Sequence, residues 1–581
     1  MVEPTIPAGA TIAAFVMAVI SWYGMLRTGV QLVHDDIESR KSAEEDILNV
    51  LVDLQHQETS FKDWKRSWRI SKQTPNAVLL QYWGARRLNM INEKLKRIKS
   101  DLEKAREKLG RLAEMKNSDW ADMSKFKRML YKESFVWAKK KYVQELIDRW
   151  PKNMTVIKEE SDAGWLEQKQ SLDREIAHVT PYHIQVAHLL VQIAMQNLKD
   201  AEALRTCCQV VRDDIAIFLD LDLFDAFAAV PEDQHVERIE QVLQAGHLKL
   251  ELLLREANRQ RAELTRVVVE RVSNRATPES RVVDAFKAIL STLDCTPYFA
   301  SNASTLFRLS KCRRAGDPCS TLQQSFREVL ADQDPPTYNA LTGQFLNHGT
   351  VLGELSNARA AFELAQACLL FLRTDWIREL CRCTVRCGVL PNVSAAKRHQ
   401  FGLELVETTH QPPLWRNPYH PGGFVEGSPQ HSWCTKNYHW YGLNKPIRHL
   451  GLLLVELSLS TIVFPETDSN IDGAAPVAKI HILVKAEPGP WKWETVSLKT
   501  VLKLVKQSFN DSEHFAGAVE HCLTGSFPSS PSDDEMEKHL RGFYFRIVKP
   551  YVLPMTNDSL VDFASLRDIY DIRLSSGLFS S

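Results

Sequence analysis

The sequence predicts a mainly α protein in three parts, and three observations support this fold class. The parts are an N-terminal helical bundle (1–165), a middle helical region with a linker (166–280), and a C-terminal domain that is α-rich with little β structure (281–581). Apolar residues recur three and four positions apart along most of the chain, as in amphipathic helices. Only the stretch from Val477 to Lys485 alternates cleanly enough to predict a strand. At 581 residues the chain can hold about three or four domains.

Composition and charge are those of an intracellular globular protein. The chain is 44% hydrophobic and 25% charged, which is typical of folded domains. Lys plus Arg and Asp plus Glu number 72 each, and this balance argues against a nucleic-acid partner. Eleven cysteines are scattered over the chain, unlike the dense framework of a small secreted domain. We therefore expect a cytoplasmic location, with membrane association as the open alternative.

The first apolar segment, Ala10 to Leu26, carries no charge over 17 residues. Glu3 is the only charge before Arg27, so the segment lacks the basic start of a secretory signal peptide. Its length lies at the lower edge of what can cross a bilayer and also fits a buried core helix. Composition alone favours the core helix. If the helix acts on membranes instead, the residues that insert are Phe15, Val16, Met17, Ile20, Trp22 and Leu26.

Two further patterns complete the predicted bundle. An apolar stripe with coiled-coil spacing predicts a long helix, and the mixed charges beside it favour packing inside its own bundle. The stripe consists of Leu88, Ile91, Leu95, Ile98, Leu102, Ala105, Leu109 and Leu112. A second helical pattern lies between Lys125 and Ile157, and we expect Pro151 to end that helix.

The start of this second pattern is strongly basic. Between Lys125 and Lys141, seven residues are basic and one is acidic. A solvated helix face is one explanation. Contact with an anionic membrane is the other, since each Lys or Arg near such a surface contributes about 1 kcal/mol. The lipid-contact candidates are Lys139, Lys140 and Lys141.

Helical patterns continue through the middle region. The segment "HIQVAHLLVQIAMQNL" and the longer stretch from Glu237 to Val272 both predict helices, and Ser273 to Ser280 predicts a linker. In the C-terminal domain, Ser526 to Lys538 predicts a polar loop.

Two groups of residues could carry chemistry, and for both we favour a structural role. His431, Cys434 and His439, with His410 and His420 upstream, have spacings that a zinc site could use, but only one cysteine is present and aromatic residues surround it. Cys381, Cys383 and Cys387 include two residues that would share a helical face, and buried small hydrophobes explain them best. No G-x-S-x-G elbow is present. We assign no catalytic residue, metal, cofactor or small-molecule substrate.

The N-terminal pattern is similar to the HeLo domain of fungal HET-s-type prion-inhibition proteins. The similarity rests on "AGATIAAFVMAVISWYGMLRTGVQL", "DIESRKSAEEDILNVLVDL" and "FVWAKKKYVQELIDRW", and covers roughly residues 1–165. The resemblance implies a setting of self/non-self recognition (heterokaryon incompatibility) and regulated cell death. It also implies that the first helix can be released into membranes.

The C-terminal part resembles a fungal family whose last third is a degenerate kinase C-lobe. "ARAAFELAQACLLFLRTDWI" resembles the helix that ends near a kinase catalytic loop, and "IRHLGLLLVELSLS" resembles the central hydrophobic helix of the lobe. "FAGAVEHCLTG" and "FYFRIVKPYVLPM" resemble its closing helices. The resemblance covers about 356–555 and implies a pseudokinase-like lobe.

The residues that phosphoryl transfer needs are missing. The sequence has no G-x-G-x-x-G, H-R-D, D-F-G or A-P-E motif, and Pro446 stands where a kinase has an aspartate. Asp375 follows the right helix, but no arginine precedes it and no asparagine follows five residues later. The chain between the linker and Ala358 is also short for a complete nucleotide-binding lobe. We expect a protein that is not an enzyme and that regulates cell death through its bundle.

The alternative is a soluble helical adaptor that binds other proteins, or a second copy of itself, through its helices. In either case we expect the apolar run from Ile447 onward to be buried, because it falls short of the about 20 residues of a transmembrane helix. Its core residues are Leu450, Leu452, Leu453, Leu454, Val455 and Leu457.

Overall fold

The computed structural model describes the helices, the strands and several of the turns between them. The described residues are 12–34, 41–70, 74–109, 124, 127, 140–173, 179–211, 213–220, 250–256, 264–272, 281–291, 296–302, 305–311, 324–331, 337–339, 344–346, 354–378, 380–382, 384–389, 399–405, 443–466, 476–486, 491–508, 513–527 and 531–549. Helices outweigh strands among them, so the prediction of a mainly α protein is confirmed. The chain forms two compact units, Met1–His188 (the N-terminal unit) and Leu189–Ser581 (the C-terminal unit).

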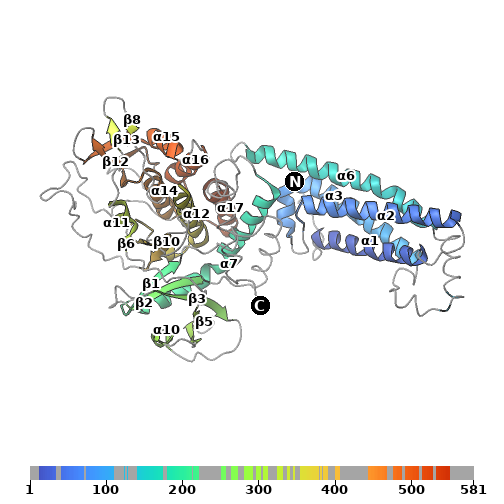
Figure 1. Ribbon diagram of the computed structural model, residues 1–581, viewed down its shortest axis with the longest axis horizontal. Helices are drawn as coiled ribbons and strands as arrows, with labels where there is room; N and C mark the ends of the chain where they lie inside the picture. The colour runs from blue at the N-terminus through green and yellow to red at the C-terminus, as the bar shows by residue number, and fades with distance from the viewer. Residues whose placement is uncertain are drawn as a thin grey trace. The chain divides into compact units, whose positions relative to one another are not determined.

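The N-terminal unit is built from long helices that lie side by side (Figure 1). They are α1 (Ile12–His34), α2 (Lys41–Ser67), α3 (Asn76–Leu109) and α6 (Lys140–Asp173), and the unit ends within α7 (Pro181–Val211). The predicted apolar stripe of α3 is buried from Leu88 to Leu102, each residue at most 1% exposed. Over these residues the stripe packs inside its own bundle as predicted, whereas the side chains of Ala105, Leu109 and Leu112 lie outside the described residues.

Pro151 does not end a helix, and that prediction is wrong. It lies inside α6, which continues to Asp173. A proline removes one backbone hydrogen bond and costs about 3 kcal/mol in a helix interior. Buried side chains on both sides of Pro151 outweigh this cost: Trp150 and Ile157 are fully buried, and Met154 nearly so.

The C-terminal unit contains more β structure than predicted. An eight-stranded sheet has the order β4-β5-β3-β2-β1-β10-β9-β6, and all of its pairs are antiparallel. Its strands are β1 (Ile215–Asp220), β2 (Leu250–Glu256), β3 (Thr265–Val272), β4 (Tyr298–Asn302), β5 (Thr305–Lys311), β6 (Gln324–Ser325), β9 (Val385–Val389) and β10 (His399–Glu404). A five-stranded sheet contains β7 (Thr337–Asn339), β8 (Gln344–Leu346), β11 (Val463–Pro465), β12 (Lys479–Ala486) and β13 (Trp491–Ser497).

The predicted helix ending at Val272 is therefore wrong over its second half. The structure places the antiparallel strands β2 and β3 there. In "TRVVVERV", Val267 and Val269 are buried while their neighbours are half-buried, which is the period-two pattern of a strand. Branched side chains also favour the extended backbone. The middle region thus contributes strands to the same sheet as β9 and β10.

The helices of the C-terminal unit include the segments that resemble a kinase C-lobe. They are α10 (Val282–Ser291), α11 (Phe326–Ala331), α12 (Glu354–Phe371), α13 (Asp375–Arg378), α14 (Asn444–Leu459), α15 (Leu498–Ser508), α16 (Glu513–Thr524), α17 (Asp533–Phe543) and the π-helix η5 (Tyr544–Val548). The six predicted core residues of α14 are each at most 3% exposed, which confirms their burial.

The one predicted strand is confirmed as β12, although both of its faces are partly covered. Ile480, Ile482 and Val484 are fully buried on the predicted face, Ala478 is exposed, and Leu483 on the other face is also buried.

Candidate functional site

The site that the sequence singles out is α1, and one stripe of this helix is completely buried. The stripe residues lie three and four apart and are each at most 1% exposed: Ile12, Ala13, Val16, Val19, Tyr23, Leu26 and Val30. This spacing puts them on one helical face. The opposite face carries small or uncharged residues, including Ala18, Ser21 and Thr28. The helix therefore has no charge on either face from Ile12 to Leu26.

The six membrane-insertion candidates do not share one environment. Val16 and Leu26 lie in the buried stripe, at 0% and 1% exposure. Phe15, Met17 and Ile20 are half-buried at its edges, and the Phe15 ring lies 5.0 Å from Lys99 Nζ on α3. The side chain of Trp22 lies outside the described residues. Insertion of all six residues would require α1 to leave the bundle.

Two of the three lipid-contact candidates, Lys140 and Lys141, lie at the start of α6. Lys139 precedes the described part of this helix, which begins at Lys140, and the side chains of Lys140 and Lys141 are also outside the described residues. The geometry of this basic cluster is therefore still a sequence prediction. In the described part of the chain, no helix is both long and apolar enough to cross a membrane.

Aromatic rings hold α1 against α2 and α6. The Tyr23 ring lies 4.2 Å from the Trp150 ring and 6.2 Å from the Phe61 ring, centroid to centroid. Phe61 in turn contacts Trp64, which stacks on Trp83 of α3 at 5.9 Å. Such pairs add about 0.5–1.5 kcal/mol each beyond their buried area. Phe61, Trp64, Trp83 and Trp150 therefore form a continuous aromatic core against which α1 packs, here called the aromatic socket.

Polar contacts fasten both ends of α1. At its start, the Ile12 backbone N–H donates to Asn76 Oδ1 over 3.0 Å, which satisfies one of the free N–H groups of the first turn. Towards its end, Arg27 Nη1 lies 3.1 Å from Oε2 of Glu58 on α2. The Glu58 side chain is only 6% exposed and also pairs with Lys62 Nζ at 2.6 Å. The Tyr23 hydroxyl is buried without a hydrogen-bond partner, and its pKa is raised by burial and by nearby Glu58.

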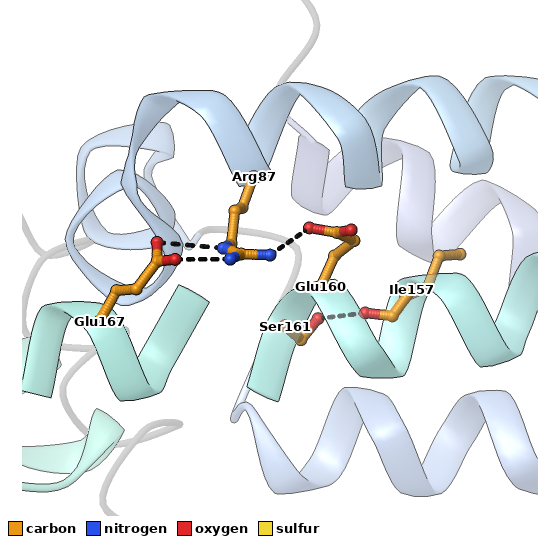
Figure 2. Close-up of polar contacts among 5 residues, drawn as sticks. All are labelled: Arg87, Ile157, Glu160, Ser161 and Glu167. Carbon is orange, nitrogen blue, oxygen red and sulfur yellow. Dashed lines mark hydrogen bonds and ion pairs between the residues drawn. The ribbon is translucent and has the colours of Figure 1, made fainter. Parts of the chain in front are cut away.

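A second polar cluster joins α3 to α6 behind this socket. Figure 2 shows Arg87 reaching from α3 to two carboxylates of α6: Nε donates to Glu167 Oε2 over 3.0 Å, and Nη1 donates to Glu160 Oε2 over 2.6 Å. Between them, Ser161 Oγ donates to the Ile157 carbonyl over 2.7 Å and accepts from Trp64 Nε1 over 3.1 Å. These hydrogen bonds fix α6 to α2 and α3, the helices that carry the aromatic socket.

Sequence reasoning missed Glu58, Arg27 and Tyr23 as a group. A usable indication exists in α2, where buried residues recur three and four apart at Leu51, Leu54, Phe61 and Trp64. Glu58 occupies the position in this series that an apolar residue would normally take. A carboxylate at such a position needs a partner, because an unpaired buried charge is costly.

In the C-terminal unit, Asp375, which follows the helix that the sequence analysis compared with the one before a kinase catalytic loop, is engaged in an ion pair. Asp375 begins α13, and its Oδ2 lies 3.0 Å from Arg205 Nη1 of α7. Thr374 Oγ1 accepts from the Trp376 N–H over 3.3 Å and so caps the same short helix. This arrangement gives Asp375 a structural partner.

The cysteine group is partly described, and its helical placement is wrong. Cys387 lies on strand β9, not on a helix, and Cys381 is buried just before it. Burial raises the pKa of Cys387 to about 12, which disfavours the reactive thiolate. Cys383 lies outside the described residues, as do His410, His420, His431, Cys434 and His439. Among the residues that are described, no three His, Cys, Asp or Glu side chains form a group that could hold a metal ion.

Comparison of the chain with protein-family models, with curated proteins and with solved structures found no match.

Proposed function

We propose that this chain is a non-catalytic regulator of fungal self/non-self recognition and cell death, in which α1 leaves a HeLo-like bundle to act on membranes. The observation that carries the proposal is the charge-free part of helix α1, Ile12 to Leu26, whose apolar stripe packs against aromatic side chains of the bundle. Its backbone bonds are satisfied within the helix in water or in lipid. The basic residues Lys139, Lys140 and Lys141 are the proposed contacts to anionic lipid.

The length of α1 limits how it can act. The charge-free part, Ile12 to Leu26, is about 22 Å long at 1.5 Å per residue, whereas the hydrocarbon core is about 30 Å thick. The proposed action is therefore entry from one face of the bilayer, with local thinning or self-association of several copies making up the difference.

The C-terminal unit is proposed to be a degenerate kinase-like domain that restrains or triggers the bundle. Strands β1 to β5, with α10 between β3 and β4, precede α12, so a β-rich part stands where a kinase carries its nucleotide-binding lobe. Its strand β3 contains arginine and glutamate but no lysine, and Asp375 is paired with Arg205. Phosphoryl transfer needs a strand lysine and free metal-binding aspartates, so these features support a regulatory lobe without catalysis.

The second candidate function is a helical adaptor, and one observation favours it. Leu48 and Val52, one turn apart on α2, are 46% and 56% exposed. Two neighbouring apolar side chains in water suit a protein partner better than solvent. The two candidates differ in whether the N-terminal unit sediments with liposomes.

The test of membrane action is dye release from anionic liposomes by residues 1–188. The fragment ends at His188, the boundary of the N-terminal unit, and so keeps Glu167 and Gln168 of α6, which a cut at residue 165 would remove. Ala18→Arg should suppress release, since a charge at the middle of an inserted helix costs about 2.5–3.5 kcal/mol on insertion scales. Thr28→Arg is the matched control. It also introduces an arginine on α1, but at an exposed position next to Arg27, outside the charge-free part of the helix.

Val16 is a poor position for this test because it is fully buried, and an aspartate there would disrupt the bundle itself. Circular dichroism and thermal melting establish that each fragment is folded. If folded wild type releases no more dye than Ala18→Arg and does not sediment with the liposomes, membrane action is excluded and the adaptor function stands.

A further inference from the structure

Glu58 is a buried charge at the junction between α1 and α2. Its side chain is 6% exposed, whereas its two partners among the described residues, Arg27 and Lys62, are 43% and 41% exposed. The two partners differ in one respect. Lys62 lies one turn away on the same helix as Glu58, and Arg27 lies on α1. When α1 leaves the bundle, Lys62 stays with the carboxylate and Arg27 departs.

The cover over this carboxylate comes from α1 as well. Tyr23 is 1% exposed, its hydroxyl has no hydrogen-bond partner, and it is close enough to feel the charge of Glu58. Departure of α1 would therefore remove both the cover and the guanidinium and let water reach the carboxylate. In the closed state, the carboxylate lacks that water and depends on its ion pairs.

We propose that Arg27 and Glu58 form an electrostatic latch that holds α1 in the bundle. Desolvation of the Glu58 carboxylate favours the open state, and the Arg27 guanidinium offsets this only while α1 is closed. Arg27 is also the first charged residue after the charge-free part of α1, so the latch lies where the apolar helix ends. The latch rests on the proposed release of α1 and explains what opposes it.

The sign of the effect distinguishes a latch from an ordinary surface ion pair. Arg27→Gln leaves the Glu58 carboxylate buried beneath α1 with Lys62 as its remaining described ion-pair partner, so α1 should open more often. Glu58→Gln should open α1 much less, because a neutral amide needs less hydration. The double variant should return to the level of Glu58→Gln, since no buried carboxylate then remains to be solvated. Arg27→Lys keeps the charge and should stay close to wild type.

The measurement is amide hydrogen exchange of the full-length chain without any membrane. We expect Arg27→Gln to accelerate exchange in α1 about tenfold or more, because a buried carboxylate loses one of the charges that is paired with it. The amides of α2, α3 and α6 should change much less. Glu93→Gln is the matched control, because Glu93 is an exposed glutamate of α3 that pairs with Lys96 at 2.7 Å. It should leave α1 exchange unchanged.

Three results would overturn the latch. Unchanged α1 exchange in Arg27→Gln would show that the guanidinium does not hold the helix. Equal acceleration in all bundle helices would show general destabilisation. A double variant as fast as Arg27→Gln would show that the effect does not act through the carboxylate. Because no lipid is present, failure of the latch leaves the dye-release result intact, and failure of dye release leaves the latch result intact.

Discussion

Gly164 of α6 lies directly against the backbone of α3 at Trp83. A Cβ atom at this position would lie 2.9 Å from the Cα atom and 2.9 Å from the carbonyl oxygen of Trp83. Both are backbone atoms, so neither can move without shifting α3. The ion pairs of Arg87 with Glu160 and Glu167 flank the same contact. The close approach of these two helices therefore depends on the missing side chain.

Gly164→Ala should destabilise the N-terminal unit by roughly 1–3 kcal/mol, the usual cost of overpacking a core. Gly24→Ala on α1 is the opposite case, because a Cβ there meets nothing within 4 Å. An alanine in a helix interior is better than glycine by about 0.5–1 kcal/mol, so this variant should be more stable than wild type. Urea unfolding followed by helical circular dichroism measures both. Equal effects of the two substitutions would contradict the packing at Gly164.

At this scale the sequence predicts burial only where polar and apolar residues alternate clearly. In α1 nearly every residue is apolar, so the sequence could not tell the inward Val16 and Leu26 from the half-buried Phe15, Met17 and Ile20. The role of Glu58 follows from its place in an apolar series, but its partner Arg27 lies on another helix. Only the packing of α1 against α2 brings the two together.

Among the elements, α14 is buried along almost its whole length and places the carboxyl group of Glu456 in the core. Glu456 is 0% exposed, and its Oε1 lies 2.8 Å from Arg382 Nη1 and accepts from the Val463 N–H over 3.1 Å. Arg382 also stacks on the Phe464 ring at 4.5 Å. Burial outweighs both partners and raises the pKa of Glu456 to about 7. The folded protein therefore holds a proton here that the unfolded chain releases at lower pH.

The stability of the C-terminal unit should fall as pH rises through this range. Because the folded-state pKa is raised, the stabilising contribution of Glu456 is present below its ordinary pKa and is lost as pH rises towards about 7. The slope is at most about 1.4 kcal/mol per pH unit. Glu456→Gln should remove this component, so urea midpoints of wild type and variant should converge or cross between pH 5 and pH 7.5. Parallel midpoints would contradict the raised pKa.

Element types could be predicted where local pattern and tertiary packing agree, as in α3, α14 and β12. Element types could not be predicted where pairing with strands far away in the sequence determines the backbone conformation. The strands β2 and β3 pair with each other and, on either side, with β1 and β5, and this pairing overrides a spacing that also fits a helix. The start of α17 was predictable and was missed: Ser532 and Glu535 form a capping box inside the segment predicted as a polar loop.

At the scale of the whole molecule, we expect no binding of Mg-ATP, because kinase motifs are missing from the sequence and Asp375 is engaged in an ion pair. The sequence has no G-x-G-x-x-G motif, and Asp375 is paired with Arg205. Millimolar Mg-ATP should therefore leave the melting temperature unchanged, because a ligand stabilises only a state that binds it. A clear rise in melting temperature would contradict this. Incorporation of labelled phosphate that Asp375→Asn abolishes would also overturn the assignment of a non-catalytic protein.

The arrangement in two units was not accessible from the sequence. The sheet of the C-terminal unit pairs β1, at Ile215–Asp220, with β10, at His399–Glu404, and no local pattern specifies a partner so far along the chain. The helices of the N-terminal unit, in contrast, show regular apolar spacing along their own sequences, although their contacts join residues as distant as Tyr23 and Trp150. Local spacing was therefore sufficient to predict helices here, and insufficient to predict the sheet.

The late position of β10 in the chain has a consequence for folding during synthesis. Helical bundles fold in microseconds to milliseconds, whereas the eight-stranded sheet cannot be completed until β10 has been made. At about 5–20 residues per second, β10 leaves the ribosome roughly ten to forty seconds after residue 188. For that interval a nascent chain presents a finished bundle with no completed partner domain. Whatever keeps α1 in place during synthesis must therefore belong to the bundle itself.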